Sequence, residues 1–180
     1  MSRKIKMGMI GGGRGAFIGA VHRMAAGIDG QIDFVAGALD VNPEIAILSG
    51  QDLFLSPDRI YPTYQEMIEK ESKLPVGERI DFVSIVTPNH VHFDPAKLAL
   101  ENGFHVVCEK PMTYSLEEAL ALEKLVDETG LVFALTHTYT GYPMIKQARE
   151  MIQSGVFGKI RKVVVEYPQG WLSTPLETTG

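Results

Sequence analysis

A cluster of glycines near the N-terminus has the residue types and spacing that hold a phosphate group. Residues 11–16 read Gly-Gly-Gly-Arg-Gly-Ala and follow a short apolar run that predicts a buried strand. They match G-x-G-x-x-A, a variant of the fingerprint in which backbone N–H groups and a helix N-terminus bind a pyrophosphate. In that pattern Gly11 makes the tight turn, Gly13 lets the backbone approach the phosphates, and Ala16 is small enough for helix–strand packing. The alternative is a glycine-rich turn without a ligand.

An acid at the end of the second apolar run suits the ribose of a dinucleotide. Asp40 stands where a carboxylate accepts hydrogen bonds from a ribose 2′-hydroxyl and repels a 2′-phosphate, which favours NAD over NADP. It falls later than the usual spacing of about 20 residues, and the additional turn at residues 17–19 together with the loop at Asp29 and Gly30 would explain the difference. Two alternatives stay open. Asp40 solvates a strand end, or Arg14 pairs with a phosphate and admits NADP.

Two further polar clusters follow later apolar runs. Residues 87–92 read Thr-Pro-Asn-His-Val-His, and residues 109–111 read Glu-Lys-Pro. In a doubly wound sheet the carboxyl ends of the strands form one ligand-binding edge, so both clusters are expected beside the glycine loop. Lys110 would place a flexible cation where cofactor and substrate meet, and Glu109 would orient that lysine or contact a ribose. The alternative for Lys110 is an ordinary exposed lysine at a strand end.

The remaining candidates favour structural roles. His90 and His92 lie two positions apart without a third ligand placed by the sequence, so we predict no metal site. Cys108 falls in a predicted buried strand, where a small core residue is a better interpretation than a reactive thiol. His137, after the last predicted strand, either faces the substrate or is structural.

The elements that position these residues alternate between strand and helix. Apolar runs predict six short strands, at residues 4–10, 32–39, 59–61, 81–86, 105–108 and 131–135. Capping residues and helical periodicity predict helices from residues 16, 43, 64, 94, 116 and 143, and the polar segment 71–78 reads as a loop. This alternation indicates an α/β fold with a doubly wound parallel sheet, the Rossmann fold.

The last part of the chain departs from this alternation. After the helix at 143–154, a valine-rich run at 160–167 predicts a strand that would begin another sheet. We therefore divide the chain into a dinucleotide-binding domain at 1–140 and, at 141–180, a crossover helix with the first strand of a second, α+β domain. Because a single strand cannot bury its own faces, the chain is expected to be a fragment of a longer protein.

Composition narrows the class of protein further. The chain has 180 residues, 45% of them hydrophobic, a net charge of −5 and one cysteine. We expect no nucleic-acid surface, because acidic and basic residues are interspersed. No apolar run reaches the roughly 20 residues of a membrane helix, and the glycine-broken N-terminus does not resemble a signal peptide. The single cysteine fits a reducing compartment, so we expect a cytoplasmic protein.

The order G-x-G-x-x-A, T-P-N-x-x-H and E-K-P, each at a strand end, resembles the Gfo/Idh/MocA family of oxidoreductases. The resemblance covers Ile5 to about Trp171. It implies an NAD(P)-binding first domain, a substrate-binding second domain and a homo-oligomeric parent protein. It also implies that Thr87, Asn89 and His92 line the cofactor pocket. Glu109 and Lys110 would lie by the nicotinamide, with Lys110 helping catalysis.

The function that follows is hydride transfer between a nicotinamide cofactor and a secondary alcohol of a sugar or polyol. The acid/base pair that the family carries in its second domain is not in this sequence, so the piece alone is expected to turn over slowly or not at all. The alternative is a non-catalytic dinucleotide-binding or sensor module. A methyltransferase using S-adenosylmethionine also has a glycine loop, but it does not explain the Glu-Lys-Pro turn.

Overall fold

The computed structural model describes residues 3–173, which form two compact units divided between His137 and Thr138. The first unit is built on a five-stranded parallel sheet in the order β2-β1-β3-β4-β5. This order has β1 in the interior with the chain winding outward to both sides, so the predicted doubly wound sheet is confirmed. The strands are β1 (Ile5–Gly11), β2 (Ile32–Ala38), β3 (Phe82–Val86), β4 (His105–Cys108) and β5 (Phe133–Leu135).

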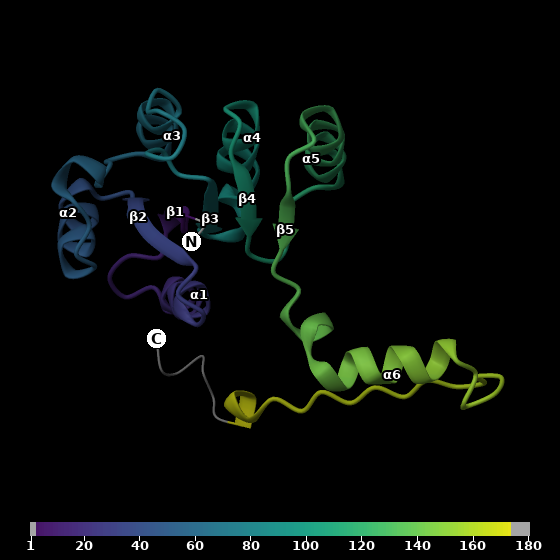
Figure 1. Cartoon of the computed structure of the whole chain (residues 1–180). Coiled ribbons are helices and arrows are strands. Elements are labelled where there is room, and N and C mark those ends of the chain that lie inside the picture. The colour runs from purple at the N-terminus through teal and green to yellow at the C-terminus, as the bar shows by residue number, and fades with distance from the viewer. Residues whose placement is uncertain (1–2, 174–180) are drawn as a thin grey trace. The chain divides into compact units, whose positions relative to one another are not determined.

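Helices cover both faces of this sheet. Figure 1 shows α3, α4 and α5 along one face, α1 on the opposite face and α2 at the β2 end. The predicted caps are present: the Asn42 side chain accepts from the amides that open α2, and Ser115 with Glu118 forms a capping box at α5. The helices of this unit are α1 (Phe17–Gly27), α2 (Pro43–Asp52), α3 (Tyr64–Ser72), α4 (Phe93–Glu101) and α5 (Leu116–Thr129).

The central strands are buried on both faces, as their continuous apolar sequences predict. On the side of α3 and α4, Val83 and Ile85 pack in a cluster with Phe104 and Leu100. A second cluster contains Met7, Met9 and Leu39, with residues of α1 packed against it. The two clusters hold the strand ends in fixed positions, and those ends carry the candidate site.

The predicted third strand at residues 59–61 is reduced to one bridge. Ile60 pairs with Gly37 in parallel, and the Tyr61 amide donates to the Gly37 carbonyl at 2.8 Å. The strand does not extend further toward the N-terminus because Pro57–Arg59 form a short 3-10 helix. Six predicted strands therefore become five strands and a bridge.

The prediction of a polar loop from Glu71 onward is wrong at its first residues. Helix α3 continues to Ser72, and Glu71 is fully buried. Its carboxylate accepts hydrogen bonds from the Arg59 guanidinium at 2.7 Å, the Tyr61 hydroxyl at 2.8 Å and the Ile80 amide at 3.0 Å. A buried charge with this many donors is satisfied in place, and composition alone cannot distinguish it from an exposed glutamate.

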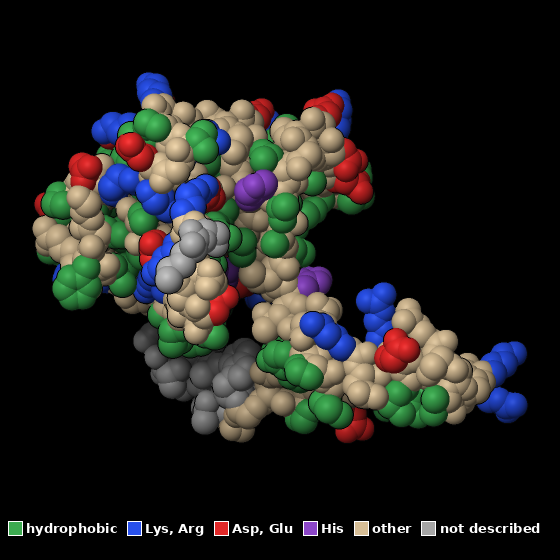
Figure 2. Space-filling view, in the orientation of Figure 1, with side chains coloured by type: hydrophobic (Ala, Val, Ile, Leu, Met, Phe, Trp, Pro, Cys, Tyr) green, Lys and Arg blue, Asp and Glu red, His purple; other side chains and the backbone are tan. Residues whose placement is uncertain are grey.

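The second unit contains α6 (Pro143–Gln153), close to its predicted bounds, and 3-10 turns at Thr138–Gly141 and Gly170–Ser173. The strand predicted at residues 160–167 does not form. Its valines are exposed, and none of the described residues pairs with it in a sheet, so its backbone groups lack the partners a strand requires. Hydrophobic side chains also lie on the surface of the α6 segment (Figure 2), among them Met144, Ile145 and Ile152. None of the helices within residues 3–173 combines the length and apolar character that a bilayer crossing needs.

Candidate functional site

The glycine loop makes the tight turn that its sequence predicts. Gly11 ends β1 with a φ of +78°, a conformation that L side chains rarely adopt. A Cβ atom on Gly11 would lie 3.0 Å from the Val86 carbonyl oxygen. At Gly13 the close approach is to the protein itself, because a Cβ atom there would lie 2.7 Å from the Ser49 hydroxyl and 2.8 Å from the Leu39 carbonyl oxygen.

The packing role expected of Ala16 belongs to Gly19. Ala16 is exposed and is the N-cap of α1, which begins at Phe17. A Cβ atom on Gly19 would lie 2.5 Å from the Cα atom of Gly12, so Gly19 is the residue that lets the helix pack on the loop. No side chain caps the start of α1, unlike α2, α3 and α5. Its first-turn amides therefore suit an anionic ligand.

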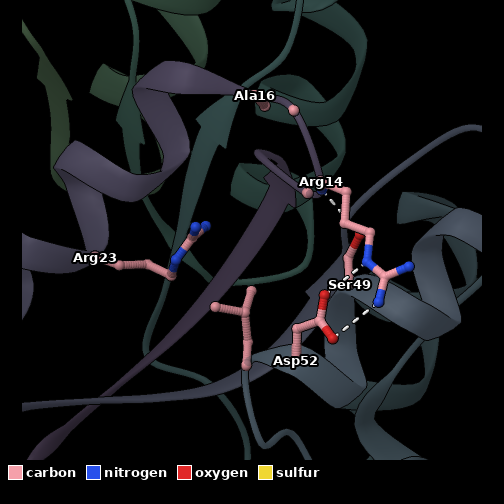
Figure 3. Close-up of a pocket in the computed structure, with 8 residues that line it drawn as sticks. Arg14, Ala16, Arg23, Ser49 and Asp52 are labelled. Atoms are coloured by element: carbon pink, nitrogen blue, oxygen red, sulfur yellow. Dashed lines mark hydrogen bonds and ion pairs between the residues drawn. The ribbon is translucent and has the colours of Figure 1, made fainter.

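A pocket of about 240 Å³ lies between this loop and α2 (Figure 3). The Arg14 guanidinium makes two hydrogen bonds to Asp52, at 2.6 and 2.9 Å, and the Arg14 amide donates to the Ser49 hydroxyl at 3.0 Å. The hydrogen bonds from Arg14 lower the pKa of the Asp52 carboxyl. Arg23, pointing toward the loop from α1, donates to the Gly12 carbonyl oxygen at 2.8 Å. The Arg14 side chain is thus held against α2.

Asp40 lines a second pocket, of about 200 Å³, together with Gly11, Val41 and Tyr64. Its Oδ1 atom accepts a hydrogen bond from the Asn42 amide at 2.8 Å and so stabilises the turn before α2. The carboxylate is partly exposed. Asp40 therefore stabilises the turn before α2 and also lies beside the glycine loop.

The residues after β3 have two different positions: Thr87 and Asn89 lie at the sheet edge, whereas His92 is buried between two loops. Thr87 lies beneath the glycine loop, with its methyl group 3.1 Å from where a Cβ atom of Gly11 would be, and its buried hydroxyl has no hydrogen-bond partner among the described residues. Asn89 is exposed. His92, expected in the pocket wall, is instead fully buried, with Nδ1 2.7 Å from the Pro111 carbonyl oxygen and Nε2 3.0 Å from that of Thr87. Both ring nitrogens therefore face carbonyl oxygens of these two loops, and neither is directed at a ligand.

Glu109 is the centre of a buried polar network. Its Oε1 atom lies 2.9 Å from Nε2 of His22 and accepts from the Thr136 hydroxyl at 2.8 Å, while Oε2 accepts from the Lys110 amide at 3.1 Å. Burial raises the pKa of Glu109, but the hydrogen bonds from His22, Thr136 and the Lys110 amide outweigh it, so the pKa is lowered. Glu109 is therefore a carboxylate at neutral pH.

Lys110 extends from this network into solvent. It is exposed, and among residues 3–173 no hydrogen bond or ion pair to its ammonium group is present. The Lys110–Pro111 peptide bond is cis. Cys108, two residues before Lys110, is buried, and burial with the nearby Glu109 charge raises the pKa of its thiol to about 12, which confirms the core interpretation. Among the described residues no three metal-ligating side chains lie close enough together to hold an ion.

Three residues of this network, His22, Ser84 and Thr136, belong to none of the motifs predicted from the sequence. His22 comes from α1, one turn after Gly19 and on the same face, and its Nδ1 lies 2.9 Å from the hydroxyl of Ser84. Ser84 is the polar residue within the apolar strand β3, which was a usable signal because a buried hydroxyl needs a partner. Thr136 follows β5 and so shares the same sheet edge.

Comparison with known proteins agrees with this arrangement. Residues 5–137 match the family model described as an oxidoreductase family with an NAD-binding Rossmann fold. The chain is 37% identical to the uncharacterized oxidoreductase YfiI of Bacillus subtilis, over 97% of this chain and 44% of that protein. It is 30% identical to the levoglucosan dehydrogenase of Pseudarthrobacter phenanthrenivorans, over 96% of this chain and 43% of that enzyme.

A solved structure is similar over nearly the whole chain. The inositol dehydrogenase homolog from Azotobacter vinelandii, complexed with NADH and myo-inositol, superposes with a TM-score of 0.90 and 41% identity, over 99% of this chain and 47% of that one. The chain spans less than half the length of these relatives. The glycine loop, the Thr-Pro-Asn segment and the Glu-Lys-Pro turn lie at one sheet edge, in agreement with this match. The chain therefore belongs to the Gfo/Idh/MocA family of oxidoreductases, and residues 5–137 form the NAD-binding Rossmann fold of that family.

Proposed function

We propose that this chain binds NAD(H) along the carboxyl edge of its sheet and is the cofactor-binding part of a sugar or polyol dehydrogenase. The observation that carries the proposal is the Glu-Lys-Pro turn. Glu109 is fixed by three donors, and the adjacent Lys110 ammonium is unpaired among the described residues, on the same edge as the glycine loop. A rigid carboxylate beside a free cation suits a site that must orient hydroxyl groups.

The parts of the cofactor are assigned by the chemistry of each position. The uncapped start of α1 and the loop from Gly11 to Ala16, including Gly13 and Arg14, would hold the pyrophosphate. The pocket that contains Asp40 would take the adenosine. The Oδ2 atom of Asp40 would face the ribose, because Oδ1 accepts from the Asn42 amide. Thr87 and Asn89 would line the path between the adenosine and Lys110, and His92 would hold that path in shape.

The bound nicotinamide would supply the hydride acceptor. Lys110 would bind the oxygen of the reacting alcohol and stabilise the negative charge that develops on it. Glu109, ionised because its pKa is lowered, would accept hydrogen bonds from a cofactor ribose while its backbone fixes where Lys110 begins. These roles use positioning and charge, and the proton-accepting group would come from a substrate domain.

The substrate class follows from the relatives. The levoglucosan dehydrogenase and the structure with bound myo-inositol both concern cyclic compounds rich in hydroxyl groups. We assign residues 141–180, with α6, to the beginning of a substrate domain, and we expect the whole protein to be a homo-oligomer. A cation such as Lys110 suits one hydroxyl of such a ring, and the others would be recognised by that domain.

The test is calorimetric titration of this chain with NADH and with NADPH, using the wild type and Asp40→Ala. We expect a preference for NADH that Asp40→Ala relaxes, because the carboxylate repels a 2′-phosphate. Asp29→Ala is a matched control, since Asp29 accepts from the amide two residues on, Gln31, at 3.0 Å, as Asp40 does from Asn42. A preference for NADPH would indicate that Arg14, and not Asp40, determines binding at the 2′ position of the ribose. Failure of the folded chain to bind either cofactor would overturn the proposal.

A further inference from the structure

We propose that His22 is a positioning residue for the nicotinamide half of the cofactor, acting through Glu109. The inference rests on the proposed function. His22 lies on α1, 87 residues from Glu109 in the sequence, yet its Nε2 atom is 2.9 Å from the Oε1 atom of that carboxylate. Its side chain is about 10% exposed, so the contact is shielded from water and is stronger than a surface pair.

The hydrogen-bond chain around His22 specifies one arrangement of protons. Ser84, buried in β3, lies 2.9 Å from Nδ1, and its hydroxyl can donate there. A neutral imidazole that accepts at Nδ1 carries its proton on Nε2, and that proton points at Glu109. The Glu109 carboxylate only accepts hydrogen bonds, so it requires the proton on Nε2, and the Ser84 hydroxyl completes this tautomer by donating to Nδ1.

The second donor on the same oxygen leaves Glu109 little rotational freedom. Thr136 donates to Oε1 from the end of β5, and the Lys110 amide donates to Oε2. Removing His22 would leave a nearly buried carboxylate with one fewer donor, and it would be free to turn toward water. Because Glu109 immediately precedes Lys110, its orientation also affects where the lysine side chain begins.

Helix α1 connects this carboxylate to the phosphate loop. One turn before His22, Gly19 packs on Gly12, and one residue after it, Arg23 donates to the Gly12 carbonyl oxygen. The same rigid element thus contacts the loop for the pyrophosphate and the carboxylate for the nicotinamide side. His22 is the side chain through which α1 reaches the second of these sites.

The experiment compares His22→Gln with His22→Asn by titration with NADH and with ADP, which lacks the nicotinamide half. A glutamine amide reaches the position of Nε2 and can still donate to Glu109, whereas an asparagine amide reaches only the position of Nδ1, beside Ser84. We expect His22→Asn to weaken NADH binding about tenfold and leave ADP binding within about twofold of wild type. We expect His22→Gln to bind NADH close to wild type. The fluorescence emission of bound NADH should be altered in the asparagine variant only.

Met24→Gln, at an exposed position of α1, controls for the new side chain. If His22→Asn does not fold, Thr136→Val removes the other donor to the same oxygen and should give the same loss of NADH binding. Unchanged NADH binding in these variants, or an equal loss of NADH and ADP binding, overturns the role of His22 while wild-type binding still supports the proposed function. Absence of wild-type binding to either ligand overturns both.

Discussion

The backbones of Gly12 and Gly19 are in contact: a Cβ atom on Gly19 would lie 2.5 Å from the Cα atom of Gly12 and 2.7 Å from its carbonyl oxygen. The phosphate loop and the first turn of α1 are therefore packed without any side chain between them. Because the obstructing atoms are backbone, they cannot rotate away as a side chain would. The helix position depends on glycine at both residues.

Gly19→Ala should destabilise the protein by about 1–3 kcal/mol, the usual cost of overpacking. This loss would come despite a gain of about 1 kcal/mol in helix propensity. It should also weaken NADH binding, because the loop moves with the helix. Urea denaturation followed by circular dichroism measures the first effect and titration the second. Gly27→Ala is the control on the same helix, where a Cβ atom meets nothing within 4 Å, and it should be neutral or slightly stabilising.

Asp52→Asn should increase the affinity for NADPH relative to NADH by about threefold. The reason is that Asp52 neutralises Arg14 through two hydrogen bonds, and the substitution frees that cation for a phosphate. Titrations with both cofactors at low and at high salt measure the effect, which salt should reduce. Glu69→Gln breaks a comparable exposed pair with Lys73 on α3 and should not change the preference. An unchanged ratio in Asp52→Asn would show that Arg14 does not reach the ribose phosphate.

Cys108 should not react with thiol reagents in the folded protein at pH 8. With a pKa of about 12, about one thiol in 10⁴ is ionised at that pH, and the group is also buried. Labelling should become complete in denaturant, and the chain has one cysteine, so the signal is unambiguous. Rapid labelling under native conditions would contradict the buried position.

Asp81 should contribute to stability at neutral pH and lose that contribution in acid. Arg3 makes hydrogen bonds to it at 2.6 and 2.7 Å and, against the opposing effect of burial, holds its pKa below the ordinary value; the Lys6 amide adds to this lowering. A lowered folded-state pKa means that the stabilisation is complete above the unfolded pKa, about 4, and is lost as the pH falls below it. Asp81→Asn should therefore lower the melting temperature at pH 7 and reduce its dependence on pH below 4.

Asp33→Asn provides the comparison for Asp81. Asp33 pairs with Lys4 at 2.9 Å on an exposed part of the surface, where both side chains are about half exposed. Such a pair contributes little to stability, so the melting temperature should stay close to that of the wild type. Equal effects of the two substitutions would mean that the geometry of Arg3 with Asp81 gives no particular stabilisation.

Local patterns predicted the fold well because the signals act over a few residues. The caps Asn42 and Ser115, the turn at Gly11 and the five strand positions all depend on neighbours in sequence. The same holds for the polar residues at the strand ends, since the carboxyl ends of parallel strands form one edge. These signals predict that Thr87 and the Glu-Lys-Pro turn lie near each other, and in the structure His92 lies within hydrogen-bond distance of the carbonyl oxygens of Thr87 and Pro111.

The errors arose where a residue depends on a distant partner. His22 was missed because its role is defined by Ser84 and Glu109, 62 and 87 positions away. Glu71 looked like a loop residue because its burial depends on donors from Arg59 and Tyr61, outside its helix. His92 was expected in the pocket wall, and the carbonyl groups that hold it inside are invisible to a motif.

Gly19 and His22 are three positions apart on α1, so they share a face of the helix. A helix turns about 100° per residue, so the direction in which His22 points toward Glu109 is fixed relative to the direction in which Gly19 faces the phosphate loop. One residue inserted between them would preserve every side chain and still turn His22 away from Glu109. The number of residues between Gly19 and His22 is thus itself a structural constraint, because it fixes the position of the phosphate loop relative to the Glu109 carboxylate.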